Sequence, residues 1–437
     1  MIGGKQILIL STGDNHGAYE AAYKIAKFLY EANYKVALVV KTKTKADPFI
    51  VQVMPLVSSV QKSIIDRIIS KIKRAFTTKE SFNSFTTDDK YLFLSKDENA
   101  QYVSADSILN SISFKPDSII SGMTDGFSNT NTLSELYQKT NAKIYIWLLD
   151  MEHFTGGCHY AWDCKGYETD CNNCPAIMEE SKKNRAYLNL QIKKNNIKKS
   201  NIQVLAGSEW VKNQAKNSSL FKSQQKIFNT NSCIDTRIMN NKNRSIAKMV
   251  FDINSDNKVI FTGSWNVNDS RKGISYFLDA LNILWRKLDI NLRDKIIVLV
   301  AGEHYGEKEF LSKIPFNKVL IDYIKDYRLL SLVYQASDIF ICSSIEDSGP
   351  MMVAEALACG TPVVGFDIGS VNTLVKNGYN GYVATLKNSD ELATGMFRIL
   401  SLSEINFNLY SSNSVTRIEK LASHEVAVKV IEELLMQ

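Results

Sequence analysis

The chain alternates short apolar runs with amphipathic stretches, and this pattern occurs twice. Residues 6–10 are an apolar run that ends in Ser-Thr-Gly-Asp, residues 18–30 then show helical periodicity, and residues 36–40 form a second apolar run. Short apolar runs separated by helices predict buried strands of a parallel sheet with helices on both faces. The pattern continues at residues 118–120, 131–140 and 144–149.

The second half repeats this order of elements. Strands are predicted at residues 258–262, 296–301, 337–342 and 361–366, with helices at 274–287 and 351–358. Two doubly wound α/β units account for the length of the chain. We place an N-terminal domain at residues 1–235 and a C-terminal domain at 236–419, and the pattern leaves open whether the final helical segment, 420–437, packs back on the first domain.

The composition is that of an ordinary globular protein, with 437 residues, 45% hydrophobic and 22% charged. No apolar run is long enough to span a membrane and the start has no signal-peptide pattern, so we expect a cytoplasmic protein. Seven cysteines fit a reducing compartment. Basic stretches at 62–79 and 182–199 favour an anionic partner, but nothing in their pattern indicates nucleic-acid binding.

Two carboxylates lie eight positions apart in a predicted loop-helix junction, Asp347 and Glu355. Gly349-Pro350 opens the helix, where free backbone N–H groups and the positive end of the helix dipole suit a phosphate. Carboxylates accept hydrogen bonds from vicinal hydroxyls, as on a sugar or ribose. The alternative is a helix-capping acid followed by a solvent-facing glutamate.

The residues that follow, Glu355-Ala-Leu-Ala-Cys-Gly-Thr-Pro-Val-Val364 and Gly369-Ser370, resemble a motif of the retaining glycosyltransferases of family four. The resemblance implies the GT-B architecture, two Rossmann-like domains facing a cleft, and a nucleoside-diphosphate sugar as donor without a catalytic metal or cofactor. It assigns Asp347 or Glu346 to the transferred sugar and Glu355 to the ribose. The other residues that it places at the donor are Ser348, Gly349, Pro350, Met351 and Met352. Asp347 stands where the family has Glu, which predicts an altered sugar preference.

A glycine-bounded loop, residues 263–273, ends in Arg271 and Lys272. Fixed cations stabilise a bound diphosphate and the departing nucleoside diphosphate. An ordinary surface pair is the alternative. The loop is similar to the family's strand-loop-Lys-Gly element, and this similarity places Gly263, Arg271 and Lys272 at the donor, with Ser264 where the family has Arg.

The N-terminal half contains two further similar segments. Gly17-Ala18 resembles part of the family's Gly-Gly-Ala loop at the donor phosphate, with His16 in place of the first Gly. A plain strand-to-helix turn is the alternative. Residues 147–160 resemble a subgroup that builds bacterial surface polysaccharides, with Leu149 where the subgroup has histidine, and the remaining polar candidates are Asp150, predicted to be catalytic, and His153.

Four clustered cysteines, Cys158, Cys164, Cys171 and Cys174, have intervening spacings of five, six and two residues. Clustered thiolates in a reducing compartment bind zinc, and such a site would be structural. Free thiols or a redox pair fit the same spacing.

Residues 61–76 place isoleucines and Phe76 on one helical face with lysines and arginines around it. Such a helix lies at an anionic membrane surface or packs on a sheet. The first alternative predicts peripheral contact with the inner membrane face, which suits a lipid-linked acceptor.

Further segments fit the family: 206–211, 234–236, 334–338 and 380–383. The sequence therefore predicts a sugar transferase acting on a glycan or lipid-linked acceptor in surface polysaccharide synthesis. The alternative is a nucleotide-sugar-binding protein with little activity, suggested by His16, Leu149 and Ser264. A dinucleotide oxidoreductase is disfavoured because no Gly-x-Gly-x-x-Gly follows the first strand.

Overall fold

The computed structural model describes residues 4–15, 17–54, 85–266, 269–303, 310 and 312–436. The chain forms two compact units. The first comprises Met1–Leu205 and Gln214–Ile227, and the second comprises Ala206–Asn213 and Phe228–Gln437. Two of the sequence predictions, on His16 and on the helix at 61–76, lie outside the described residues.

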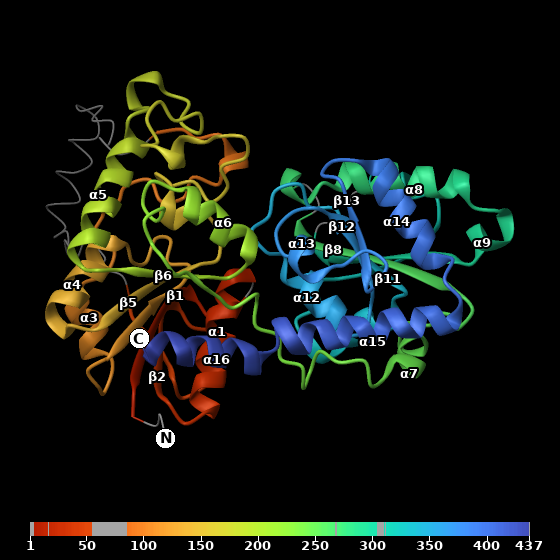
Figure 1. Cartoon of the computed structure of the whole chain (residues 1–437), viewed down its shortest axis with the longest axis horizontal. Coiled ribbons are helices and arrows are strands. Elements are labelled where there is room, and N and C mark those ends of the chain that lie inside the picture. The colour runs from red at the N-terminus through yellow and green to blue at the C-terminus, as the bar shows by residue number, and fades with distance from the viewer. Residues whose placement is uncertain are drawn as a thin grey trace, which may run out of the picture. The chain divides into compact units, whose positions relative to one another are not determined.

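A seven-stranded sheet with the order β3-β2-β1-β4-β5-β6-β7 forms the framework of the N-terminal half (Figure 1). Its strands are β1 (Gln6–Gly13), β2 (Lys35–Thr42), β3 (Ile50–Gln52), β4 (Ser118–Ser121), β5 (Lys143–Leu148), β6 (Gln203–Ala206) and β7 (Phe228–Asn229). The interior strand β1 pairs in parallel with β2 and β4, and its apolar residues Ile7 to Leu10 are fully buried. Burial on both faces explains the continuous apolar run of this strand.

The helices of this half are α1 (Gly17–Glu31), α3 (Ala105–Asn110), α4 (Thr130–Thr140), α5 (Arg185–Lys199) and α6 (Glu209–Asn217). Helix α1 contacts β1 and β2, whereas α4 contacts β5 and α5 (Figure 1). Side-chain caps fix where α3 and α4 begin, since Ser104 accepts from Ser107 N and Asn129 accepts from Thr132 N.

The second unit contains a six-stranded sheet with the order β10-β9-β8-β11-β12-β13, and all its neighbouring strands run parallel. The strands are β8 (Lys258–Asn266), β9 (Ile296–Glu303), β10 (Asn317–Ile321), β11 (Ile339–Cys342), β12 (Val363–Phe366) and β13 (Gly381–Ala384). The helices are α7 (Arg244–Val250), α8 (Ile274–Lys287), α9 (Ile290–Asp294), α11 (Tyr327–Ala336), α12 (Met351–Ala358), α13 (Val371–Leu374), α14 (Ser389–Leu400), α15 (Glu404–Leu421) and α16 (His424–Met436). The predicted fold class, α/β with two doubly wound parallel sheets, is confirmed.

Two hydrophobic cores cover the two faces of the second sheet. Ile260 of β8 packs with residues of α8 and α14, whereas its neighbours Val259 and Phe261 pack with residues of α11, α12 and α15. This alternation is the two-residue period of a strand whose faces are both buried. Figure 1 shows α8 and α14 on one side of the sheet and α12 and α15 on the other.

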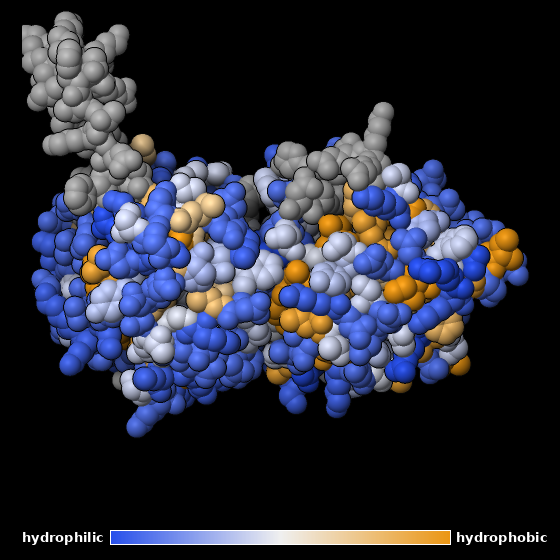
Figure 2. All heavy atoms as spheres, turned by 90° about the horizontal axis from the view of Figure 1, so that it is seen from above, coloured by the Kyte–Doolittle hydropathy of each residue, from blue (hydrophilic) through white to orange (hydrophobic). Residues whose placement is uncertain are grey.

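Apolar side chains on the visible surface occur as separate spots between hydrophilic ones (Figure 2). Ile290 of α9, Trp285 of α8 and Phe397 of α14 are among the large apolar residues exposed on the second unit. Scattered apolar residues of this kind are ordinary on a globular surface. None of the helices in the described ranges combines the length and the apolar character that crossing a bilayer requires.

Candidate functional site

The predicted loop between a strand and a helix is confirmed at residues 343–350, which join β11 to α12. Pro350 is the N-cap of α12, and no side chain caps the helix. The helix dipole therefore presents its positive end at this loop without a capping acid. This is the carboxyl end of the sheet, where ligands of open α/β folds bind.

Lys272 and Asp347 form an ion pair in this loop. The Lys272 Nζ lies 2.6 Å from Asp347 Oδ2, and the backbone N–H of Gly349 donates to Asp347 Oδ1 at 3.1 Å. Burial opposes the charged carboxyl, but the charges of Lys272 and Arg271 and the hydrogen bonds outweigh it and lower the pKa of Asp347. Asp347 is thus an ionised carboxylate held beside the start of α12.

The cationic loop is tied to the acidic loop through the backbone. Ile345 N donates to the carbonyl of Arg271 at 2.7 Å, and Ser343 Oγ donates to the carbonyl of Lys272 at 2.8 Å. The Arg271 guanidinium pairs with Asp269, its neighbour in the same loop. Lys272 therefore forms an ion pair with Asp347, the predicted sugar-binding acid. Arg271 forms its ion pair within its own loop, with Asp269.

Gly273 makes this contact possible. Its φ is +60°, and a Cβ on it would lie 2.1 Å from the carbonyl oxygen of Ser343. Only a residue without a side chain fits the left-handed conformation and the close approach together.

We expect Gly273→Ala to lower the free energy of unfolding by more than about 2 kcal/mol, because left-handed strain and a backbone clash add together. Urea denaturation measures the change. Gly378→Ala is the matched control, since Gly378 also has a positive φ, +72°, but open space around it. Equal losses in the two variants would contradict the role of the Ser343 contact.

Glu355, the second predicted acid, lies on α12 and is buried. The hydroxyl of Tyr334, on α11, donates to Glu355 Oε2 at 3.0 Å. Burial and then the charge of Glu355 raise the pKa of Tyr334, so the hydroxyl keeps its proton and fixes one carboxylate oxygen. Glu346 is also buried, in the loop next to Asp347.

The remaining predicted donor residues surround the start of α12. A Cβ on Gly263 would lie 2.8 Å from the Met352 methyl carbon, so β8 packs closely against the first turn of this helix. The Ser208 hydroxyl donates to the carbonyl of Ser348. Ser208 lies in the 206–211 segment, and the sequence motif of that segment assigned no role to the serine hydroxyl.

In the first unit, Gly17 begins α1 with a φ of +50°, and Ala18 follows it. The next residue, Tyr19, donates its hydroxyl to Asp125 Oδ1 at 2.9 Å. Asp125 follows β4, so this contact joins the carboxyl ends of β1 and β4. These two predicted residues therefore occupy a strand-to-helix turn at the carboxyl edge of the first sheet.

Asp150 follows β5 and is paired with a histidine that the sequence analysis did not select. His159 Nδ1 lies 2.7 Å from Asp150 Oδ2, and Glu152 N donates to Asp150 Oδ1. His159 is buried, and within the described ranges its Nε2 has no hydrogen-bond partner. Burial disfavours the imidazolium, but the charge and hydrogen bond of Asp150 outweigh burial and raise the pKa of His159.

A raised histidine pKa makes stability depend on pH. The stabilisation by the Asp150–His159 pair is fully present below the unfolded pKa of about 6.5 and is lost as pH rises through the folded value. We expect the free energy of unfolding to fall more steeply between pH 6 and pH 9 in the wild type than in His159→Gln. Urea titrations of both proteins at each pH measure this difference, and parallel curves would contradict the assignment.

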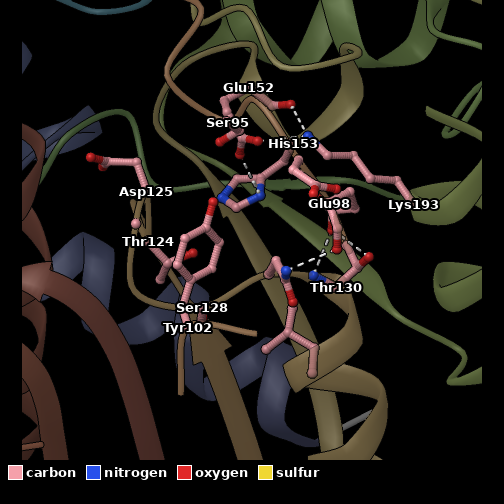
Figure 3. Close-up of a pocket in the computed structure, with 14 residues that line it drawn as sticks. Ser95, Glu98, Tyr102, Thr124, Asp125, Ser128, Thr130, Glu152, His153 and Lys193 are labelled. Carbon is pink, nitrogen blue, oxygen red and sulfur yellow. Dashed lines mark hydrogen bonds and ion pairs between the residues drawn. The ribbon is translucent and has the colours of Figure 1, made fainter. Parts of the chain in front are cut away.

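A polar pocket at this edge is lined by charged side chains from distant segments (Figure 3). Lys193 of α5 donates to the carbonyl and to Oε1 of Glu152 at 2.7 and 2.6 Å. Glu98 accepts from Thr130 N and Oγ1 at 2.8 and 2.6 Å. Figure 3 shows Glu98, Glu152 and Lys193 gathered together, with the carboxyl group of Asp125 pointing away from them.

His153 belongs to the same network. Its Nε2 lies 2.9 Å from the carbonyl of Gly122, and its Nδ1 lies 3.2 Å from Glu152 Oε2. Burial opposes ionisation of Glu152, but Lys193, His153 and His159 outweigh it and lower its pKa. Burial raises the pKa of Glu98, which Lys193 offsets only in part. Lys193 lies within the basic stretch at 182–199, so that stretch is not entirely a solvent-facing surface.

The predicted zinc site is not supported. The four cysteines line one small cavity, together with Phe93 and Tyr167. Across the described ranges, however, no group of three or more His, Cys, Asp or Glu side chains is placed to hold a metal ion. None of the four cysteines forms a disulfide bond.

One segment of the chain matches a known protein family. It contains the Lys272–Asp347 pair, Glu355 and the start of α12. Residues 245–413 match the family of glycosyl transferases group 1. The matched segment covers the sheet and nearly all the helices of the second unit. Residues 245–413 are therefore similar to a glycosyl transferase group 1 domain.

Curated relatives that match part of this chain are named glycosyltransferases. An uncharacterized glycosyltransferase of Haemophilus influenzae is 26% identical over 167 residues, 38% of this chain and 44% of that protein. A UDP-Gal:alpha-D-GlcNAc-diphosphoundecaprenol alpha-1,3-galactosyltransferase of Escherichia coli is 26% identical over 157 residues, 34% of this chain and 38% of that protein. The chain thus spans less than half the length of these two curated relatives.

Solved structures support the fold over the whole chain. The Anabaena protein HepE, solved in complex with UDP and glucose, has a TM-score of 0.61 and 13% sequence identity. The alignment covers 99% of this chain and 100% of HepE. Together with the group 1 domain, this similarity identifies the two α/β units as those of the GT-B fold.

Proposed function

We propose that the chain is a retaining glycosyltransferase that moves a hexose-type sugar from a nucleoside-diphosphate sugar to a glycan or lipid-linked acceptor in surface polysaccharide synthesis. The main support is the contact between Lys272 and Asp347 at the uncapped start of α12. A cation, a carboxylate and a helix N-terminus in one loop suit the two parts of such a donor. The cation and the helix suit the diphosphate, and the carboxylate suits the sugar hydroxyls.

The electrostatics support leaving-group stabilisation. When the bond between the anomeric carbon and the diphosphate oxygen breaks, negative charge develops on the nucleoside diphosphate. Lys272 and the N-terminus of α12 are fixed positive groups that stabilise this charge without reorganising. A bound diphosphate would compete with Asp347 for Lys272, which would free Asp347 Oδ2 to accept a hydrogen bond from the sugar.

Residues of the first unit are assigned to the other half of the reaction. We propose that residues 1–235 bind the acceptor, that Gly17 and Ala18 approach the donor phosphate, and that Asp150 acts at the reacting sugar. Asp150 is held for such a role, because His159 and the backbone of Glu152 fix both of its oxygens. The Escherichia coli relative is named for a diphosphoundecaprenol-linked acceptor, which favours a lipid-linked acceptor here and peripheral membrane contact.

The experiment measures nucleoside diphosphate release from a panel of nucleotide sugars, with and without a lipid-linked acceptor. Acceptor-stimulated release, with the anomeric configuration kept in the product, is the expected result. Donor binding without release from any donor would favour the alternative, a nucleotide-sugar-binding protein with little activity. That alternative is suggested by Leu149 and Ser264, which stand where the family has functional side chains.

A further inference from the structure

Trp265 is an exposed aromatic residue near the carboxyl end of β8. It is 48% exposed, whereas Phe261, the other aromatic residue of this strand, is fully buried. Its ring meets that of Tyr323 at 4.6 Å between centroids and an interplanar angle of 72°. Tyr323 follows β10, so the edge-to-face contact fixes the Trp265 ring across the end of β9, which lies between β8 and β10.

This aromatic pair lies on the same edge of the sheet as the Lys272–Asp347 pair. Trp265 is two residues beyond Gly263, the residue that packs against Met352 in the first turn of α12. Strand β8 is irregular between Gly263 and Asn266, and two residues of chain span at most about 7 Å. Lys272 and Asp347 come from the loops after β8 and β11, whereas Trp265 and Tyr323 extend toward β9 and β10. A ligand with its diphosphate at Lys272 can thus continue along the edge onto the aromatic pair.

We propose that the exposed ring of Trp265 is the platform on which the nucleobase of the donor stacks. This inference rests on the proposed function, because it takes the diphosphate to be bound at Lys272 and the start of α12. A nucleobase has two flat, weakly hydrated faces, and an immobilised indole ring offers the matching surface. Because every base has such a face, stacking on Trp265 contributes affinity without selecting among uracil, guanine and adenine.

The test measures binding of UDP, GDP, ADP and inorganic pyrophosphate by calorimetry. Trp265→Ala is expected to weaken binding of the nucleotides about 5- to 100-fold and to leave pyrophosphate binding unchanged. Lys272→Ala is expected to weaken binding of all four. Trp265→Phe keeps an aromatic face and should restore most of the nucleotide affinity. Trp285→Ala is the matched control, because Trp285 is 38% exposed but packs on Arg293 at the far end of α8.

Tryptophan fluorescence gives an independent readout. Nucleotide binding should quench the emission of the wild type and of Trp285→Phe, and this quench should be lost in Trp265→Phe. Wild-type nucleotide affinity in Trp265→Ala, with weakened binding in Lys272→Ala, would overturn the platform and leave the proposed function standing. If the wild type binds no nucleotide and no nucleotide sugar, the proposed function itself fails.

Discussion

Replacing Lys272 by alanine is expected to reduce donor-dependent release of nucleoside diphosphate by about 100- to 1,000-fold, the usual effect of removing one fixed charge-stabilising group. Its ammonium group lies 2.6 Å from Asp347 and beside the start of α12, where the diphosphate is proposed to bind. The loss should appear in kcat as well as in donor KM, because the developing charge of the leaving group is greater than that of the bound donor.

The variant also leaves Asp347 buried without its cation, which by itself could unfold the loop. A double variant, Lys272→Ala with Asp347→Asn, removes both charges and separates the two effects. It should recover the thermal stability lost in the single variant but not the activity. Lys287→Ala is the matched control, since Lys287 lies at the end of α8 and contacts Thr394. Release within about threefold of wild type in Lys272→Ala, measured on folded protein, would rule out the assigned role.

Replacing Lys193 by methionine should give the largest loss of stability, a decrease of about 3–5 kcal/mol in the free energy of unfolding. The Lys193 side chain is 1% exposed, and its ammonium group donates twice to Glu152. Its removal leaves the buried Glu152 carboxylate without this cation, and it removes a positive charge that acts on Glu98. Chemical denaturation followed by circular dichroism measures the change.

Lys194→Met is the control at the next position, where the side chain is exposed, and it should change the unfolding free energy by less than about 0.5 kcal/mol. A second variant, Lys193→Met with Glu152→Gln, removes the buried charge along with its partner. It should recover part of the loss, because an uncharged amide costs less to bury than an unpaired carboxylate. If Lys193→Met and Lys194→Met are equally stable, the buried network is not a major source of stability.

Much of the candidate donor site could be predicted because its residues are contiguous in the sequence. Asp347, Gly349, Pro350 and Glu355 lie in one strand-loop-helix segment, so local patterns place them together. The contact of Lys272 with Asp347 was not predicted as such, because the two residues are 75 positions apart and each was assigned to a different part of the donor. The expected pairing of Arg271 with the diphosphate stays a prediction.

The first unit was predicted less completely. His153 was selected as the candidate histidine, whereas the structure pairs His159 with Asp150. The two histidines are six residues apart in one irregular loop. A loop has no regular spacing of apolar residues, so the sequence does not indicate which histidine contacts Asp150 at the end of β5. The four cysteines were correctly grouped as neighbours, but their spacing did not determine whether the thiols are arranged around a metal ion.

The sequence by itself determined most of the strands, several of the helices, and the loop-helix segment that bears Asp347 and Glu355. A strand buried on both faces has a continuous run of apolar residues, and a helix buried on one face has apolar residues at helical spacing. Both patterns can be recognised in a short stretch of sequence. Only the tertiary structure decided which charged groups meet: Lys272 with Asp347, His159 with Asp150, and Lys193 with Glu152. These contacts depend on the order of the strands in each sheet and on how the loops at its carboxyl edge fold back, and a local pattern of apolar residues encodes neither.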